Sequence, residues 1–229
     1  MTIIGIVSKP TNDDKSLWTK QKITDDFRKI IIENGGVAIG VLPTNVNYNK
    51  AMTQSEKENF HKILSLCDGF ILQGGWQTGN HEIYVAKYAI ENDIPLLGTC
   101  CGLNNILFSQ GDTVQNERDE SHNIYDRDYR HDIIVDETSK LYKLIGENKK
   151  IGVNSIHNVM IKDSDVNHFD VVAHDLNGFV EAVELKDKRF CLGLKWHPEI
   201  MEEDNCMQNI FKEFVRVCNE YHKKRNKEI

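Results

Sequence analysis

One stretch, Ile94–Leu103, constrains the fold more than any other part of the sequence. A short apolar run leads into the pattern Gly-x-Cys-x-Gly over 98–102, and the apolar residues of an expected helix follow. A cysteine between two glycines at a strand-to-helix turn is typical of a nucleophile elbow, where neighbouring side chains would clash. The amides and dipole of the following helix lower the pKa of such a thiol. We therefore expect Cys100 to be a nucleophile, although a buried cysteine pair at a helix start would give the same pattern.

Apolar runs alternate with helical periodicity through the first half of the chain. We expect strands at Ile3–Ser8, Val37–Leu42, Gly69–Leu72 and Ile94–Leu97, and helices at Gln21–Asn34, Thr53–Leu66 and Asn80–Asn92. This alternation predicts an α/β fold with a mostly parallel central sheet and helices on both faces.

The second half is expected to be rich in strands. Short apolar runs occupy 132–135, 150–153, 159–161, 170–174, 179–185 and 190–194. The pair Asn177-Gly178 between two of these runs is a strong hairpin signal. Apolar spacing over Asp204–Asn226 predicts a closing amphipathic helix. No linker or repeat interrupts the sequence, so we expect a single domain over residues 1–229.

Charge and cysteine usage exclude several classes of protein. With 28 basic and 35 acidic residues the net charge is −7, and no basic stripe is present, which argues against nucleic acid as a partner. No apolar run has membrane-spanning length and the N-terminus lacks a basic leader, so no membrane association is expected. The six cysteines show no Cys-x-x-Cys pair or disulfide-like spacing. We therefore expect a cytoplasmic protein in a reducing compartment.

A second motif, Lys195-Trp196-His197-Pro198-Glu199, supplies the partners that a cysteine nucleophile needs. His197 follows an apolar strand, and active-site residues gather at strand ends in open α/β sheets. Glu199, two residues later, is placed to fix the imidazole tautomer. The cysteine motif alone is moderately specific and the His-Pro-Glu motif alone is weak, but their joint occurrence predicts a catalytic triad of Cys100, His197 and Glu199.

These two motifs resemble those of class I glutamine amidotransferases. The segment Leu72–Gly75 continues this resemblance. Three further segments are similar to the γ-glutamyl hydrolase branch of that superfamily, the peptidase C26 or γ-glutamyl-γ-aminobutyrate hydrolase type: Gly111–Gln115, Val153–His157 and Phe179–Glu184. The resemblance runs from about Ile3 to Glu199 and implies the flavodoxin-like fold of the superfamily.

The resemblance also implies roles for particular residues. Backbone N–H groups of Gly75 and Cys101 would form the oxyanion hole, and no metal or other cofactor is implied. The residues implied in substrate binding are Gly74, Asn104, Gln115, Ser155 and His157. For His157 a packed strand-end histidine is an equally good reading, and the Cys101 side chain is expected to be structural.

The sequence departs from the family pattern around the substrate, so the substrate's identity stays open. Cys101 stands where the family often has Arg, Asn104 where it often has Gln, and Trp76–Gly79 where many hydrolases have Asp-Val-x-Pro. The favoured activity is hydrolysis of a small γ-glutamyl amide through a γ-glutamyl thioester. The alternatives are a glutaminase subunit supplying ammonia to a partner synthase, a hydrolase of a γ-glutamyl nucleotide or phosphoramidate, and, less favoured, a non-catalytic binding module. Homo-oligomerisation is open.

The segment between the nucleophile helix and the β-rich half carries three arginines: Arg118, Arg127 and Arg130. Guanidinium groups bind carboxylate or phosphate at two points. We expect these arginines near the mouth of the site, where they would favour a leaving amine that bears an anionic group. The alternative is weak surface pairing with the aspartates and glutamate of the same segment.

Overall fold

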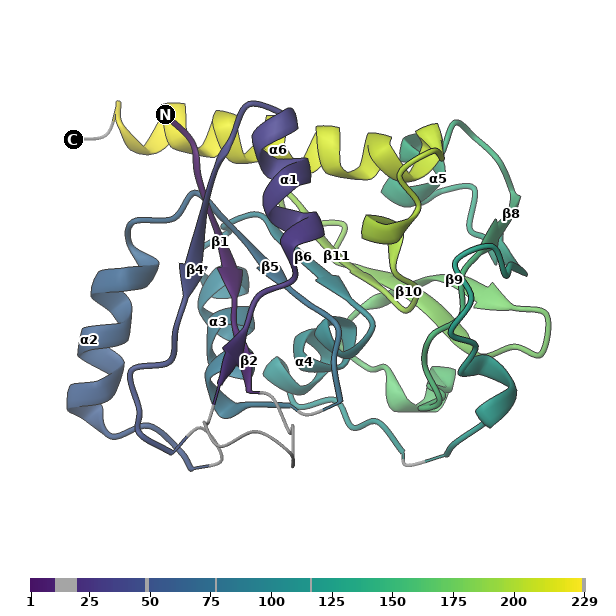
Figure 1. The fold of residues 1–229 in the computed structure, drawn as a ribbon, viewed down its shortest axis with the longest axis horizontal. Coiled ribbons are helices and arrows are strands. Elements are labelled where there is room, and N and C mark those ends of the chain that lie inside the picture. The colour runs from purple at the N-terminus through teal and green to yellow at the C-terminus, as the bar shows by residue number, and fades with distance from the viewer. Residues whose placement is uncertain (11–19, 48–49, 77, 116, 228–229) are drawn as a thin grey trace.

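A mixed β-sheet forms the centre of the computed structural model, which describes residues 1–10, 20–47, 50–76, 78–115 and 117–227 (Figure 1). Within these residues the sheet has nine strands in the order β4-β1-β5-β6-β11-β10-β9-β7-β8. Their bounds are β1 Ile3–Val7, β4 Val37–Val41, β5 Gly69–Leu72, β6 Leu96–Thr99, β7 His131–Val135, β8 Lys150–Val153, β9 Asp170–Asp175, β10 Val180–Glu184 and β11 Cys191–Leu194. The strands from β4 to β11 pair in parallel, and those from β11 to β8 pair antiparallel. The short strands β2 Lys9–Pro10 and β3 Gln21–Lys22 pair separately.

Helices cover both faces of the sheet, as the sequence predicts. Their bounds are α1 Asp25–Glu33, α2 Gln54–Leu64, α3 Asn80–Glu91, α4 Cys101–Ser109, α5 Lys140–Leu144 and α6 Asn205–Arg225. One apolar core joins buried residues of α1, α5 and α6 to the sheet, and a second joins those of α2, α3 and α4. Figure 1 shows α6, in yellow, running along the upper side of the molecule beside α1. The α/β prediction is therefore confirmed.

Local sequence signals account for several element ends. Thr53 caps α2 in a capping box, since its backbone N–H donates to Glu56 Oε2 at 2.7 Å and its hydroxyl accepts from the Glu56 N–H at 3.3 Å. The predicted hairpin joins β9 to β10. Gly178 has φ of +86° there, a value that favours glycine.

The structure corrects two expectations about individual elements and adds one helix that the sequence analysis did not predict. The helix expected from Gln21 begins at Asp25, because Gln21–Lys22 pairs with β2 as a strand. The segment Val159–Ile161 is not a strand, and Val159 forms only an isolated bridge with Arg118. Sequence periodicity missed the short helix α5, whose first N–H group, that of Lys140, donates to both oxygens of the Glu184 carboxylate at 3.0 and 3.1 Å.

The pairing of β6 with β11 positions the site. These strands are distant in sequence but adjacent and parallel, with Thr99 opposite Leu194. Both carboxyl ends therefore lie at the same edge of the sheet, where the chain continues into Cys100 after β6 and into Lys195–His197 after β11. This is the edge at which α/β proteins bind ligands.

Candidate active site

Cys100 occupies a strained turn between β6 and α4. Its backbone has φ of 51° and ψ of −109°, a region that residues other than glycine rarely adopt. The Cys100 N–H donates to the Leu194 carbonyl at 2.7 Å and so extends the pairing of β6 with β11. Strained backbone at the end of a strand is the geometry of a nucleophile elbow.

The two flanking glycines are required by close backbone packing. A Cβ atom on Gly102 would lie 2.0 Å from the Leu72 carbonyl oxygen. A Cβ on Gly98 would lie 2.7 Å from the carbonyl carbon of Gly102. The Gly-x-Cys-x-Gly spacing thus lets α4 start directly against β5 and β6.

His197 and Glu199 form a short ion pair beside the cysteine. The imidazole Nδ1 lies 2.7 Å from Glu199 Oε1, and Glu199 is buried in the one-turn helix η3 (Pro198–Ile200). A Cβ placed on Gly74 would lie 3.2 Å from both Cys100 Cβ and His197 Nε2, so these groups meet over Gly74. The structure therefore brings together the three residues predicted as a triad.

Asn154 fixes the backbone of the histidine, a role that sequence reasoning missed. Its side-chain amide donates to the His197 carbonyl at 2.7 Å, and its Oδ1 accepts from the His197 N–H at 2.9 Å. Asn154 lies within Val153–His157, one of the segments that resemble the family. That motif was the sequence signal that could have indicated its role. The double contact fixes the histidine backbone at the start of η3.

Electrostatics favour a thiolate–imidazolium pair. Burial raises the pKa of the Cys100 thiol, but the charges of His197 and Lys195 outweigh it and lower that pKa to about 7. Burial lowers the pKa of His197, yet Glu199 and the Cys100 thiolate hold it well above its ordinary value. Because the thiolate is the nucleophilic form, this pair is suited to attack on an acyl carbon near neutral pH.

The neighbouring thiol of Cys101 lies in a different environment. Its Sγ accepts from Lys9 Nζ at 3.3 Å, and the same ammonium lies 2.7 Å from Glu82 Oε1. Burial raises the pKa of Cys101 despite Lys9. A buried thiol that keeps its proton is a weak nucleophile, so its side chain fits the structural role expected from the sequence.

The two residues predicted as oxyanion donors, Gly75 and Cys101, lie beside the nucleophile. Cys101 is the first residue of α4, where N–H groups have no intrahelical acceptor. Gly75 has φ of +154°, and a Cβ there would lie 2.5 Å from the side chain of Lys9. Both residues line the same cavity as Cys100.

A cavity of about 910 Å³ opens over Cys100 and His197. Among the substrate-binding residues implied by the resemblance, Gly74, Asn104 and His157 line it. Ser155 and Gln115 do not: the Ser155 hydroxyl donates to the His122 carbonyl at 2.8 Å, and Gln115 is exposed. The cavity is large enough for a small amide substrate with a sizeable leaving group.

Two exposed aromatic rings line the cavity: Trp76, from the turn where the sequence departs from the family pattern, and Tyr125, which the sequence analysis did not name. Trp76 and Tyr125 are 72% and 69% exposed, and their rings stack with centroids 6.5 Å apart. Arg118 also lines the cavity, whereas Arg127 and Arg130 do not. The Arg130 guanidinium donates to the Tyr129 carbonyl at 2.7 Å.

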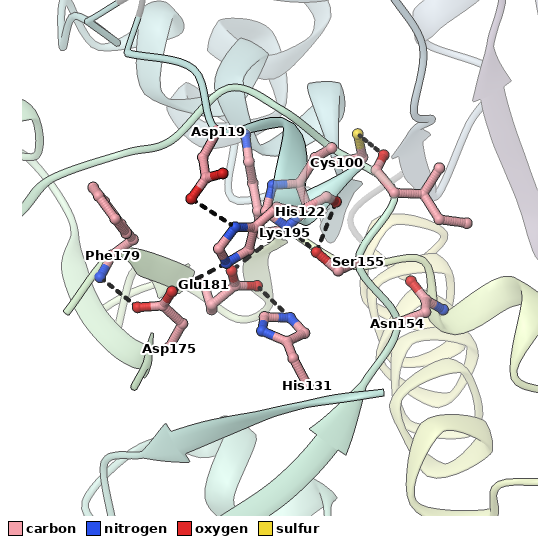
Figure 2. A network of polar contacts seen from close by, with 12 residues as sticks. Cys100, Asp119, His122, His131, Asn154, Ser155, Asp175, Phe179, Glu181 and Lys195 are labelled. Atoms are coloured by element: carbon pink, nitrogen blue, oxygen red, sulfur yellow. Dashed lines mark hydrogen bonds and ion pairs between the residues drawn. The ribbon is translucent and has the colours of Figure 1, made fainter. Parts of the chain in front are cut away.

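A buried polar network lies beside the cysteine (Figure 2). The Glu181 carboxylate is fully buried, 3.5 Å from His157 Nε2 and 4.0 Å from His131 Nε2. In the described part of the chain these are the residues whose donor atoms could hold a metal ion, within 4.8 Å of one another. The Lys195 charge acts on the same carboxylate and would oppose a cation there.

Comparisons with known proteins agree with this geometry. The sequence model of the family described as Peptidase C26 matches residues 77–199. The γ-glutamyl-γ-aminobutyrate hydrolase PuuD of Escherichia coli is 26% identical over 233 residues, covering 88% of each protein.

CTP synthases are also similar to this chain. The CTP synthase of Lactobacillus helveticus is 25% identical over 209 residues, but the chain spans only 39% of that enzyme's length while 77% of the chain is matched. The glutaminase domain of Trypanosoma brucei CTPS, solved with bound acivicin, superposes with a TM-score of 0.67 at 19% identity, covering 96% of this chain and 94% of that one. This structural likeness supports the fold. None of the helices in the described residues has both the length and the apolar character that crossing a membrane requires.

Proposed function

Because the chain belongs to the Peptidase C26 family, we propose that it is a cysteine hydrolase that cleaves the C–N bond of a γ-glutamyl amide. The proposal rests on the thiolate–imidazolium pair of Cys100 and His197 at the carboxyl edge of the sheet. Cys100 sits on a strained elbow with a thiol pKa of about 7, and His197 is held by Glu199 at 2.7 Å. The similarity to a γ-glutamyl-γ-aminobutyrate hydrolase over 88% of both chains supports the substrate class.

In the acylation step, the Cys100 thiolate adds to the γ-carbonyl carbon and the carbonyl oxygen becomes an oxyanion. The backbone N–H groups of Gly75 and Cys101 donate to that oxyanion, and losing one such donor typically costs about 10²–10³ in rate. His197 then gives its Nε2 proton to the amide nitrogen as the C–N bond breaks. The amine leaves, and a γ-glutamyl thioester remains on Cys100.

In the deacylation step, the now neutral His197 accepts a proton from a water molecule, whose oxygen adds to the thioester carbonyl. The C–S bond breaks, the thiolate is restored and glutamate leaves. Glu199 keeps its charge throughout and stabilises each imidazolium state.

Release of p-nitroaniline from γ-glutamyl-p-nitroanilide tests the proposal directly. Wild-type protein should release it with turnover, and Cys100→Ala should not. Cys101→Ala is the matched control, because it removes the adjacent thiol without touching the elbow nucleophile. Absence of turnover with a panel of γ-glutamyl amides by wild-type protein would contradict the proposal.

A glutaminase that supplies ammonia to a partner synthase is the second candidate. It is favoured by the matches to CTP synthases, of which this chain covers about two fifths. Free glutamine as substrate separates the two. Faster ammonia release from glutamine than amine release from γ-glutamyl amides, with stimulation by cell extract, would favour the synthase partner.

Arg118 supports an anionic leaving group, such as an amino acid or a phosphate-bearing amine, including a γ-glutamyl nucleotide or phosphoramidate. Arg118 lines the cavity and is exposed to solvent. Arg127 and Arg130 lie outside the cavity lining, so the preference should depend on Arg118 alone. Paired amides whose amines differ only in an anionic group test this, and equal kcat/KM for both would refute it.

The setting proposed for this activity is the cytoplasm. A catalytic thiol must stay reduced, and all six cysteines are free. Both points support a reducing compartment such as the cytoplasm. We propose that residues 1–229 form a single domain, and that this domain acts alone, as a homo-oligomer or with a synthase. Size-exclusion chromatography with light scattering, together with cell fractionation, tests both statements.

A further inference from the structure

A lysine that exchanges no proton or bond in the proposed mechanism is buried in the lining of the active-site cavity. Lys195 directly follows β11 and is 2% exposed, and its N–H donates to the Glu181 carbonyl at 2.7 Å. This pairing continues the contact between β10 and β11. The side chain lines the same cavity as Cys100 and His197.

The Lys195 ammonium has more donors than acceptors around it. An ammonium carries three N–H donors. In the part of the chain that the structure describes, its Nζ has one hydrogen-bond acceptor, Asn104 Oδ1 at 3.1 Å, and forms no ion pair with a carboxylate. A buried charge without a partner is unfavourable by several kcal/mol, and such groups are therefore rare. A ligand in the cavity can supply hydrogen-bond acceptors for the remaining N–H donors of Lys195.

Burial and the nearby acidic groups act in opposite directions on the Lys195 ammonium. Burial lowers the pKa of Lys195 below its ordinary value, although the charges of Cys100 and Glu181 act to raise it. The Glu181 side chain is fully buried outside the cavity lining. An anion bound in the cavity can therefore still pair with the Lys195 ammonium.

We propose that Lys195, positioned by Asn104, binds the α-carboxylate of the γ-glutamyl group. This inference rests on the proposed hydrolase function and assigns the acyl end of the substrate to the buried end of the cavity. The γ-glutamyl group stays on Cys100 through the thioester, so it belongs at the enclosed end. The amine must depart, and the exposed rings of Trp76 and Tyr125 mark the open end.

Charge-assisted hydrogen bonds make this pairing selective. A carboxylate accepting from a buried ammonium gives a short, strong contact, and an acyl group lacking that carboxylate leaves the ammonium unpaired. Lys195 would then distinguish γ-glutamyl amides from simple aliphatic amides.

The experiment compares two chromogenic amides that share p-nitroaniline as leaving group. One is γ-glutamyl-p-nitroanilide and the other is 4-aminobutanoyl-p-nitroanilide, which lacks only the α-carboxylate. The variant is Lys195→Met, which keeps the length of the side chain, with Lys195→Gln as a second neutral variant. Lys186→Met is the matched control, since it removes one lysine charge at the far end of the β10–β11 pair.

Lys195→Met should lower kcat/KM for the γ-glutamyl amide by about 10- to 200-fold, mainly through KM. Its loss on the truncated amide should be at least about tenfold smaller, whereas Lys186→Met should lower neither. Equal losses on both amides would overturn the inference, because they would mean that Lys195 acts only on the thiolate.

Protection of Cys100 from alkylation separates this inference from the proposed function. L-glutamate should slow iodoacetamide alkylation of Cys100 in wild-type protein and in Lys186→Met, but not in Lys195→Met or Lys195→Gln. If neither amide is cleaved and this protection is nevertheless seen, the hydrolase proposal fails and the carboxylate site stands. If glutamate protects all variants equally, the carboxylate site is refuted.

Discussion

Replacing Glu199 by Gln is the most informative change to the site, because it removes one charge and leaves the side chain's shape. Glu199 is 3% exposed, and its Oε1 lies 2.7 Å from His197 Nδ1. Its Oε2 has no hydrogen-bond partner within the described residues. The substituted amide can therefore turn either its oxygen or its nitrogen toward the imidazole.

The expected effect follows from the loss of a buried charge pair. Breaking such a pair typically costs about 3–5 kcal/mol, which corresponds to about 10²–10⁴ in the population of the thiolate–imidazolium state. The pKa of His197 should fall and that of Cys100 should rise, since each supports the charged form of the other. We therefore expect kcat to fall by about 10²–10⁴-fold, with a much smaller change in substrate binding.

Two measurements check this expectation. The first is kcat and KM for γ-glutamyl-p-nitroanilide, and the second is the pH dependence of Cys100 alkylation by iodoacetamide. The alkylation midpoint should move upward from about 7 in Glu199→Gln. Glu202→Gln, an exposed glutamate after η3, serves as the control. An unchanged kcat, or an unchanged alkylation midpoint, would refute the assignment of Glu199 as the residue that supports the imidazolium.

Three further predictions follow from the elbow. Cys100→Ala should abolish turnover and keep the wild-type melting temperature, and retained turnover would contradict the nucleophile assignment. The wild-type kcat/KM should rise as the pH rises through about 7, because Cys100 loses its proton there while His197, with its raised pKa, keeps its own. A kcat/KM that falls across this range would contradict the prediction that Cys100 deprotonates before His197. Gly102→Ala should destabilise the protein by about 3 kcal/mol or more, since its Cβ would lie 2.0 Å from the Leu72 carbonyl oxygen, and an unchanged urea midpoint would show that α4 can shift without cost.

Much of the site could be predicted because its chemistry is encoded over short stretches. The elbow depends on five consecutive residues, and the contact between His197 and Glu199 spans two positions. Sterics at a strand-to-helix turn and hydrogen bonding within a single turn are local, so residue type and spacing are enough to indicate them. The alternation of apolar runs likewise predicted a parallel sheet with helices on both faces.

The sequence by itself thus predicted which residues would carry the chemistry, and the tertiary structure decided what surrounds them. Periodicity does not specify strand order, and only the pairing of Thr99 with Leu194 brings Cys100 beside Lys195 and His197. The same pairing places the Lys195 ammonium on Asn104, a contact between residues 91 positions apart. Such contacts depend on which elements pack together, because apolar patterning fixes the buried face of each element and not its neighbour.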